Sequence, residues 1–366
     1  MGLGALGGYL TTNFSWPMIF FVNLPFGIAA VFLAQTFLPA DSEIKQTVKK
    51  VDWAGIGLLI VGLGSLQWML EDGNSEDWFE SGEITALAIL AVVGLGLFVW
   101  RELTAKEPAV DLRVLRHRQL AAGSAFNAVL GMGLFGATFA LPIFTQSVLS
   151  YTAEQTGTLM LPGALASAMM MPVMGKLVNK YDARLLVTIG ALVFVATMFA
   201  LQGINPQTSR DSFFWPLIGR GIGISLMFMP LTTASLGSLP KQDLASASAF
   251  TNLARQMGGS IGIAVLATML ARREAFHRAT LLEHVSALDP QFQIRFQALV
   301  QGFMQKGADL ATAQQRAYAA IDRTVSVQAA VISFGDVFHI VGWAFLIALP
   351  LVLLLGKGGR PVADAH

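Results

Sequence analysis

Residues 184–203 read RLLVTIGALVFVATMFALQG, an almost unbroken run of apolar side chains with a single charge at its first position. A helix of this length is long enough to cross the hydrocarbon core of a lipid bilayer. The whole chain has the same character, because 54% of its residues are hydrophobic and only 13% are charged. So few charges cannot cover a water-exposed surface. The sequence therefore predicts an all-α polytopic membrane protein.

Eight further apolar runs accompany this one. They lie at 16–39, 53–71, 83–101, 119–149, 154–178, 213–238, 243–270 and 331–356. The run at 119–149 is long for one span, and its glycines together with Pro142 predict one bent or tilted helix rather than two spans. Residues 1–10 form an apolar stub that is too short to cross a bilayer.

Basic residues gather in alternate connections between these runs, which indicates the orientation of the chain. The short loops of the opposite set hold a single basic residue, Arg210. Among them, the loop at 72–82 is acidic. Because cytoplasmic loops are rich in lysine and arginine, the basic set and the C-terminus are predicted to be cytoplasmic. That set contains Lys45, Lys49, Lys50, Arg101, Lys106, Arg113, Arg116, Arg118, Lys176, Lys180, Arg184, Lys241, Lys357 and Arg360.

Residues 271–330 are different, because they are polar and carry charges of both signs. Apolar residues between Leu281 and Leu299 recur at helical spacing. The segment therefore predicts two or three amphipathic helices on the outer side of the membrane, with Pro290 opening one of them.

Composition and motifs also exclude several classes of function. A net charge of +1 predicts no nucleic-acid partner, and the lack of cysteine excludes disulfides and zinc–sulfur sites. The G-x-G-x-x-G pattern from Gly131 to Gly136 lies inside a span and follows no strand, so we interpret it as helix packing or bending. His277 and His284 could meet as metal ligands, but ordinary surface histidines are the favoured interpretation.

Two arginines lie within apolar runs. A charge there costs at least about 2.5 kcal/mol, so each should face a polar cavity or a partner. Arg220 lies among glycines, and Arg255 is close to Asn252 and Gln256 on one predicted helix face. A cavity or gate face and structural pairing between helices both remain open for these residues.

Several adaptable side chains could line a substrate cavity. Methionine suits promiscuous surfaces, although core packing or contact with lipid explains any single one as well. The predicted lining residues are Phe135, Gln146, Met170, Trp215, Arg220, Met229, Asn252 and Arg255. Asp336 and His339, at i and i+3 near the outer end of the last run, could form a proton-responsive pair or simply lie at the membrane interface.

Seven stretches together resemble a known family nearly end to end. They are GGYL (7–10), SWPMIFFVNLPFG (15–27), PAVDLR (108–113), LPGAL (161–165), GKL (175–177), PLTT (230–233) and NLARQMGGSIG (252–262). The sequence resembles the 14-span drug:proton antiporters of the major facilitator superfamily, the EmrB/QacA type, and most closely their EmrB-like permease branch.

The resemblance implies a domain organisation. Residues 1–39 correspond to the end of an N-terminal six-helix half, which implies that the first four and a half spans are lacking. Residues 40–118 hold two additional helices and a cytoplasmic linker. Residues 119–356 form the C-terminal half with the outer insertion at 271–330, and 357–366 form a cytoplasmic tail. A truncated gene product and a natural short protein both remain open.

The resemblance also implies a function. It predicts a secondary active exporter of hydrophobic compounds, not an enzyme, that works by drug:proton antiport and alternating access. The proton gradient supplies the energy and no cofactor is needed. The location implied is a bacterial inner membrane, with a periplasmic adaptor and an outer-membrane channel as partners. A dedicated metabolite or siderophore exporter and a non-transporting membrane partner subunit are the alternatives.

Family motifs imply further site residues. Gly4, Gly7 and Gly8 lie in the region of an antiporter signature, although Leu3-Gly4 stands where the family has Gly-Pro. Simple close packing of helices explains these glycines equally well. The same packing or motif role is implied for Gly258, Gly259 and Gly262.

A cytoplasmic gating loop is implied around Lys176, Asp182 and Arg184, with Asn179 at the usual acidic position. Anchoring by positive charge is the alternative for this loop. The proton-coupling carboxylates are expected in the lacking spans, because no carboxylate lies deep within an apolar run.

Overall fold

The computed structural model describes residues 7, 10, 15–37, 52–105, 108, 110–237, 239–240, 243–286 and 288–356. Most of these residues are helical, and no strand lies among them. In this part of the chain nine helices are long and apolar enough to cross a membrane. Each coincides with one of the nine apolar runs, so the prediction of an all-α polytopic membrane protein is confirmed.

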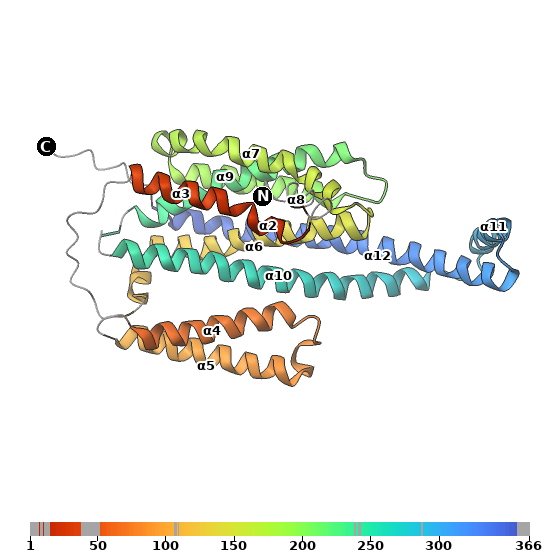
Figure 1. The fold of residues 1–366 in the computed structure, drawn as a ribbon, viewed down its shortest axis with the longest axis horizontal. Coiled ribbons are helices and arrows are strands. Elements are labelled where there is room, and N and C mark those ends of the chain that lie inside the picture. Colours follow the sequence, from red (N-terminus) through yellow and green to blue (C-terminus); the bar gives the residue numbers. More distant parts are fainter. Residues whose placement is uncertain are drawn as a thin grey trace.

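The helices are shown in chain order by their colours in Figure 1. They are α2 (Met18–Phe21), α3 (Asn23–Phe37), α4 (Trp53–Asp72), α5 (Gly82–Thr104), α6 (Arg118–Ser147), α7 (Ala153–Lys180), α8 (Ala183–Gln202), α9 (Phe214–Leu236), α10 (Leu244–Glu283), α11 (Pro290–Gln305) and α12 (Leu310–Ala348), with short 3₁₀ turns η1 (Trp78–Glu80), η2 (Leu112–Arg116), η3 (Arg210–Phe213) and η5 (Leu349–Leu354). The long run at 119–149 is the single helix α6, with Pro142 inside it, as predicted.

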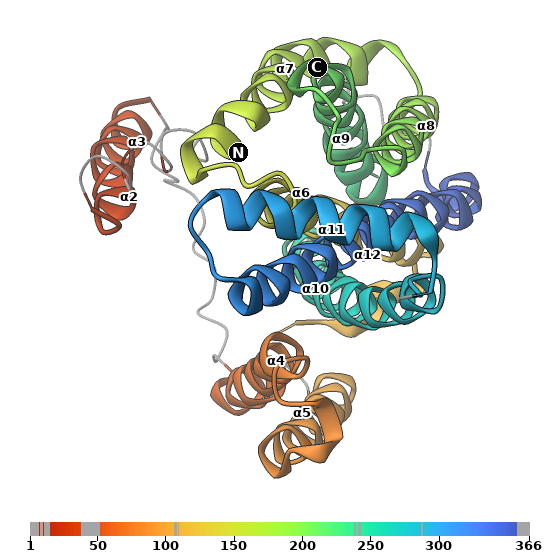
Figure 2. The ribbon, with the colours of Figure 1, turned by 90° about the vertical axis from the view of Figure 1, so that its right-hand side faces the viewer.

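Helices α6, α7, α8, α9, α10 and α12 pack together as one bundle (Figure 2). Its centre is aromatic, with the rings of Phe194 and Phe345 only 4.5 Å apart and those of Phe144 and Phe334 5.3 Å apart. Lipid tails are as apolar as these side chains, so close packing rather than exclusion of water must stabilise the bundle.

Helices α6 and α10 cross in close contact within the bundle. A Cβ atom at Gly258 of α10 would lie 2.0 Å from the carbonyl oxygen of Ala128, and one at Gly131 of α6 would lie 2.0 Å from the carbonyl oxygen of Arg255. The two backbones are therefore in direct contact, and only glycine fits at both positions. Gly259 and Gly262 continue this seam against Phe135 and Met132 of α6.

Helices α4 and α5 form a hairpin that lies beside α10, outside the bundle (Figures 1 and 2). Gly62 and Gly94 bring their two backbones together, since a Cβ at either position would lie within 3.0 Å of the partner helix. One contact with α10 is a hydrogen bond from the Ser260 hydroxyl to the Gln67 amide oxygen. Helices α2 and α3 also stand apart from the bundle (Figure 2).

The segment 271–330 is helical, as predicted, but it is not built from independent helices. Only α11 is separate, with Pro290 in its first turn as expected. The flanking parts are continuous with α10 and α12, which extend well beyond the bundle (Figure 1). The side chain of Arg278 on α10 is paired with that of Asp322 on α12, which joins the two extensions.

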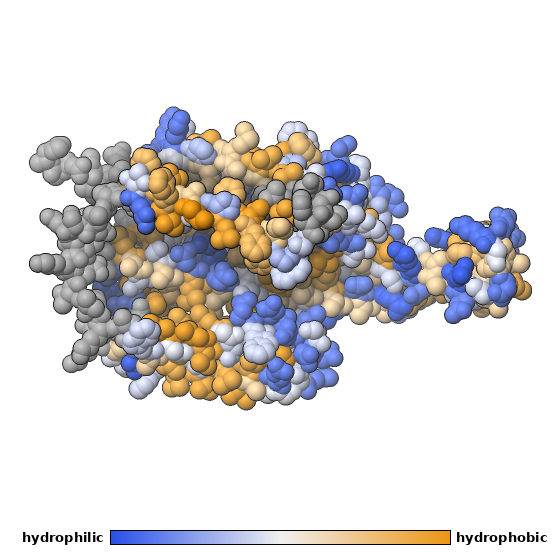
Figure 3. All heavy atoms as spheres, in the orientation of Figure 1, coloured by the Kyte–Doolittle hydropathy of each residue, from blue (hydrophilic) through white to orange (hydrophobic). Residues whose placement is uncertain are grey.

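The surface of the molecule shows the same division between a membrane region and a polar extension. Apolar residues dominate the faces of the α4–α5 hairpin and of α3, whereas hydrophilic residues gather toward the end that carries the extension (Figure 3). This pattern agrees with a bilayer around the helical bundle and an aqueous location for α11.

Candidate substrate-binding site

Arg255 is the centre of the candidate site. Its guanidinium carbon lies 4.5 Å from the centroid of the Phe228 ring on α9, and its Nη2 donates a hydrogen bond to the Asn252 side-chain oxygen one turn earlier on α10. Arg255 is half-buried and Asn252 is exposed. The predicted pairing of Asn252 with Arg255 on one face of the helix is thus present in the structure.

Gln256 does not belong to this face. It lines a groove of about 260 Å³ between α10 and α4, together with Gln67 and Ser260. Consecutive helical residues differ in direction by about 100°. Arg255 therefore points toward α9, whereas Gln256 points toward the hairpin, and the predicted grouping of both with Asn252 is wrong for Gln256.

Arg220 has a different environment from Arg255. Its side chain is buried, with the residue only 4% exposed, and its Nη1 donates to the carbonyl oxygen of Ala137 on α6 at 3.3 Å. The guanidinium therefore joins α9 to α6 inside the bundle. This geometry favours structural pairing over the cavity-lining role that the sequence left open.

The other predicted lining residues do not form one cluster. Phe135 packs where Gly259 approaches α6, and Met170 packs against the cluster around Met174. Trp215 is 74% exposed and lies more than three helical turns before Phe228 on α9, too far along the helix to share its site. Gln146 and Met229 are exposed, and of these Met229 directly follows Phe228 in sequence.

In the predicted gating loop, the carboxylate of Asp182 caps a helix and does not latch two helix ends together. Asp182 caps α8 by accepting a hydrogen bond from the backbone N–H of Arg184 at 2.9 Å, and it forms no ion pair within the described residues. Arg184 donates from Nη2 to the carbonyl oxygen of Leu355, which connects α8 to the end of the last span. Lys176 is exposed. A latch through Asp182 is therefore not formed in this conformation.

Asp336 and His339 are not paired with each other. Asp336 lies 2.9 Å from His277 Nε2 and 3.6 Å from Arg273 Nε, both on α10. His339 instead faces α8, where its Nδ1 lies 2.9 Å from Gln202 Oε1. The prediction of a pair is wrong because residues three apart on α12 here face two different neighbouring helices.

The histidines of the outer segment also differ from the sequence interpretation. His277 has a side chain only 17% exposed and contacts Asp336, so it is not an ordinary surface histidine. His284 is hydrogen-bonded to the Thr280 carbonyl within its own helix. Across the described ranges, no three or more histidine and carboxylate side chains form a group suited to holding a metal ion.

The antiporter-signature glycines lie largely outside the described residues. This holds for Gly4 and Gly8, whereas Gly7 is described and buried. A Cβ atom at Gly7 would make an ordinary contact of 3.9 Å with Ile19. Among the described residues, therefore, none would exclude a side chain at this position.

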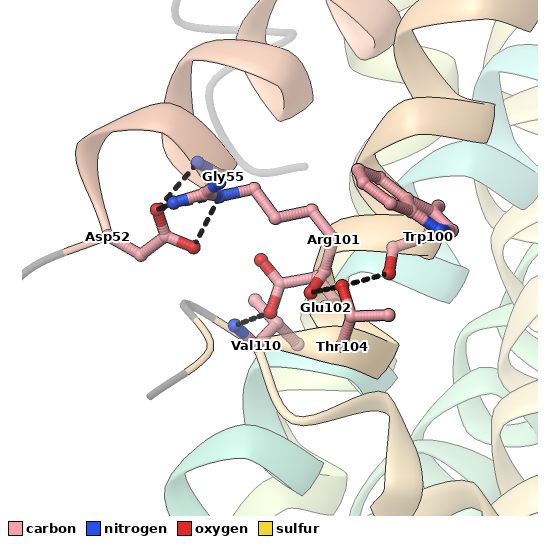
Figure 4. Close-up of polar contacts among 7 residues, drawn as sticks. All are labelled: Asp52, Gly55, Trp100, Arg101, Glu102, Thr104 and Val110. Atoms are coloured by element: carbon pink, nitrogen blue, oxygen red, sulfur yellow. Dashed lines mark hydrogen bonds and ion pairs between the residues drawn. The ribbon is translucent and has the colours of Figure 1, made fainter. Parts of the chain in front are cut away.

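A charged cluster at the ends of α4 and α5 was not singled out from the sequence (Figure 4). Asp52 accepts hydrogen bonds from the Gly55 backbone N–H at 3.0 Å and from Arg101 Nε and Nη2 at 2.9 and 2.7 Å. The adjacent Glu102 is completely buried and accepts from the backbone N–H of Val110 at 3.0 Å. An aspartate directly before an apolar run is a helix N-cap signal that could have located Asp52.

This cluster predicts a pH dependence of stability. Hydrogen bonds from Arg101 and then from the Gly55 N–H hold the pKa of Asp52 below its ordinary value of 3.8. A carboxyl with a lowered folded-state pKa stabilises the folded state above its unfolded pKa and loses that contribution as the pH falls through the folded pKa. We expect Asp52→Asn to lower the melting temperature of the detergent-solubilised protein at pH 7, and to lower it by less at about pH 3, where the pH is below the ordinary pKa of the carboxyl.

The matched control is a double-mutant cycle with Arg101→Met. In the Arg101→Met background, Asp52→Asn should have a much smaller effect at pH 7, because the ion pair is already absent. An Asp52→Asn effect of equal size at both pH values, or in both backgrounds, would contradict the assignment.

Taken together, these features define a polytopic helical membrane protein with charged side chains held inside its spanning bundle. Comparison with known proteins identifies its family. The sequence model of the Major Facilitator Superfamily matches residues 1–263 of this chain. The chain is 34% identical over 97% of its length to the multidrug export protein EmrB of Escherichia coli (strain K12), and the match covers 68% of that protein.

Two further relatives support the same family assignment. Identity is 33% over 96% of this chain to the multidrug export protein EmrB of Haemophilus influenzae, and 31% over 95% to the fatty acid resistance protein FarB of Neisseria gonorrhoeae. The match covers 67% of each relative. The chain therefore belongs to the Major Facilitator Superfamily and is EmrB-like, as the sequence motifs indicated, and it is a transporter rather than an enzyme.

Proposed function

We propose that this transporter exports hydrophobic compounds across a bacterial inner membrane in exchange for protons, by alternating access, with its C-terminus in the cytoplasm. The observation that carries the proposal is the Arg255 site. A half-buried guanidinium is held on an aromatic ring within a span of a transporter bundle. Ionisable groups in such places mark substrate or ion pathways. The relatives named as multidrug export proteins support the same substrate class.

The test is efflux from cells that lack their own exporters and express the complete product of this gene. We expect faster efflux of hydrophobic dyes and uncouplers than from vector controls. Because the proton gradient is the proposed energy source, collapsing it should stop efflux even when ATP is present. Efflux that continues without a gradient would contradict antiport. Resistance to no compound of a broad panel would contradict multidrug export and favour a dedicated metabolite exporter.

We further propose that the outer extension binds a periplasmic adaptor, which would lead to an outer-membrane channel. The supporting feature is a groove of about 550 Å³ between α11 and α12. Phe292 and Phe296 stack with centroids 6.0 Å apart, and Phe296 lies 4.5 Å from Tyr318. The groove is also lined by glutamine side chains, and such a mixture of aromatic and polar side chains is typical of a protein interaction site. Photo-crosslinking from position 318 to a co-expressed adaptor is the direct assay.

A further inference from the structure

A contact between a histidine and a carboxylate joins α10 to α12 at the level where both helices leave the bundle and enter the outer extension. The Nε2 atom of His277 on α10 lies 2.9 Å from Oδ2 of Asp336 on α12. The two side chains are 17% and 29% exposed, so water screens the contact only in part. Both helices are continuous through this level, and the contact therefore attaches the extension of α10 to that of α12.

The strength of this contact depends on the charge of the histidine. A neutral imidazole donates an ordinary hydrogen bond to a carboxylate, whereas a protonated one donates a charge-assisted bond that is roughly twice as strong. Histidine changes its charge between about pH 5 and pH 8, and an aspartate remains ionised over that range. Acid therefore strengthens the attachment of α10 to α12, and alkali weakens it.

The charged side chains next to His277 are all held by partners on the two helices. Arg273, one turn earlier on α10, has its Nε 3.6 Å from the same Asp336 oxygen and therefore opposes the charge of His277. Arg278 is paired with Asp322 of α12 and also donates to the Ser326 hydroxyl at 3.3 Å. Asp336 thus lies between two cationic groups of α10 when His277 is protonated.

The other described helices that pack against α10 and α12 carry their charges elsewhere. Helices α6 and α8 have them only in their first turns, at the opposite end of the bundle. Arg220 of α9 is enclosed against α6. The acidic end of α4 follows Gln67, which contacts α10 more than four turns before His277. Arg295 of α11 lines a groove beside the far end of α10.

The other histidine of this region, His339 on α12, has contacts of a different kind. Its Nδ1 lies 2.9 Å from Gln202 Oε1 on α8, and Trp343 Nε1 donates to its Nε2 at 2.6 Å. An indole nitrogen can only donate, so Nε2 accepts and the proton of the ring is on Nδ1. These contacts select the neutral ring. His339 therefore offers a control histidine on the same helix, with an amide and an indole in place of a carboxylate.

We propose that His277 is a sensor of the pH on the outer side of the membrane, and that its protonation strengthens the attachment of α10 to α12 through Asp336. In acid the outer extension is held in the arrangement of this structure, and in alkali its two long helices separate more readily. This regulation is additional to the exchange of protons in the proposed antiport. It rests on the proposed orientation, which places the extension outside the cytoplasm.

The first test measures the distance between α10 and α12 and does not depend on transport. Spin labels are attached to Ala279→Cys and Gln328→Cys, two exposed positions of these helices, in the complete protein with any other cysteine replaced by serine. Dipolar electron paramagnetic resonance should show the ratio of close to separated helices rising at least about threefold from pH 8 to pH 5.5, the size expected of a partly exposed ion pair. His277→Gln should remove this rise.

Three further variants make the test specific. Asp336→Asn keeps an acceptor opposite His277 without the charge, and it should remove the rise as well. His277→Arg is charged at both pH values and should keep the helices close at both. His339→Asn is the matched control and should show the full rise.

Two results would overturn the proposal. One is a rise of wild-type size in His277→Gln, and the other is its loss in His339→Asn but not in His277→Gln. Efflux of a hydrophobic dye from cells at the same two external pH values is the second readout, and its pH dependence should be smaller in His277→Gln than in the wild-type protein. A pH-dependent distance in a wild-type protein that exports nothing would leave the sensor standing and refute the export function instead.

Discussion

Replacing Gly258 with leucine is expected to abolish folding of the bundle, and replacing it with alanine to destabilise the protein by about 1–3 kcal/mol. The reason is the backbone contact between α6 and α10. A Cβ atom at Gly258 would lie 2.0 Å from the Ala128 carbonyl oxygen and 2.5 Å from the Ala128 Cα, and neither backbone atom can rotate away. The two helices must therefore separate, which disrupts packing along their whole seam. Fluorescence-detected gel filtration after heating would measure the loss.

Gly96→Ala is the matched control for this prediction. Gly96 also lies inside a spanning helix, but a Cβ atom there would meet nothing within 4 Å. Alanine has a higher helix propensity than glycine, so this variant should be at least as stable as the wild-type protein. If Gly258→Ala melted at the same temperature as Gly96→Ala, the close contact at the crossing would be disproved.

Most of the fold could be predicted from the sequence, because the bilayer restricts what an apolar chain can form. Runs such as 184–203 must be helical to satisfy their backbone hydrogen bonds in lipid. The ends of α10 and α12 were less predictable. Hydropathy falls after residue 270, but no proline or glycine interrupts the helix before Glu283. Loss of apolar character ends a span, and it does not by itself end a helix.

The candidate site was predictable only where its residues share one helix. Asn252 and Arg255 are one turn apart on α10, and the structure pairs them. The ring of Phe228 comes from α9, and helical periodicity cannot show which helix packs against which. Asp336 illustrates the same limit, since its partner His277 is 59 residues away. Spacing along one helix could not reveal that contact.

Arg220 and Arg255 could not be distinguished from the sequence for a related reason. Both lie in apolar runs beside small residues, and both carry the same cost of burial. Their difference arises from packing across helices, which leaves Arg220 enclosed against α6 and Arg255 partly open beside α9. The cluster of Asp52 and Arg101 likewise depends on the pairing of α4 with α5.

The second prediction with a large expected effect concerns the groove between α11 and α12. Met304 and Leu310 line the groove and are 45% and 54% exposed, so both can be changed without creating a cavity in a core. We expect the double substitution Met304→Glu and Leu310→Glu to weaken binding of a co-expressed periplasmic adaptor by more than about tenfold, since an unpaired carboxylate is strongly unfavourable where a partner covers it. Co-purification from solubilised membranes would measure this loss.

Two controls distinguish a loss of adaptor binding from general damage to the transporter. Gln315→Glu introduces a negative charge at another exposed position of α12, outside the residues that line the groove, and should leave the adaptor bound. Efflux across the inner membrane alone, measured in proteoliposomes, should be equal in both variants, because the groove lies beyond the spanning bundle. Equal co-purification of the adaptor with the double variant and with Gln315→Glu would mean that the adaptor binds elsewhere. Loss of vesicle transport in the double variant alone would instead show that the extension and the spanning helices are coupled.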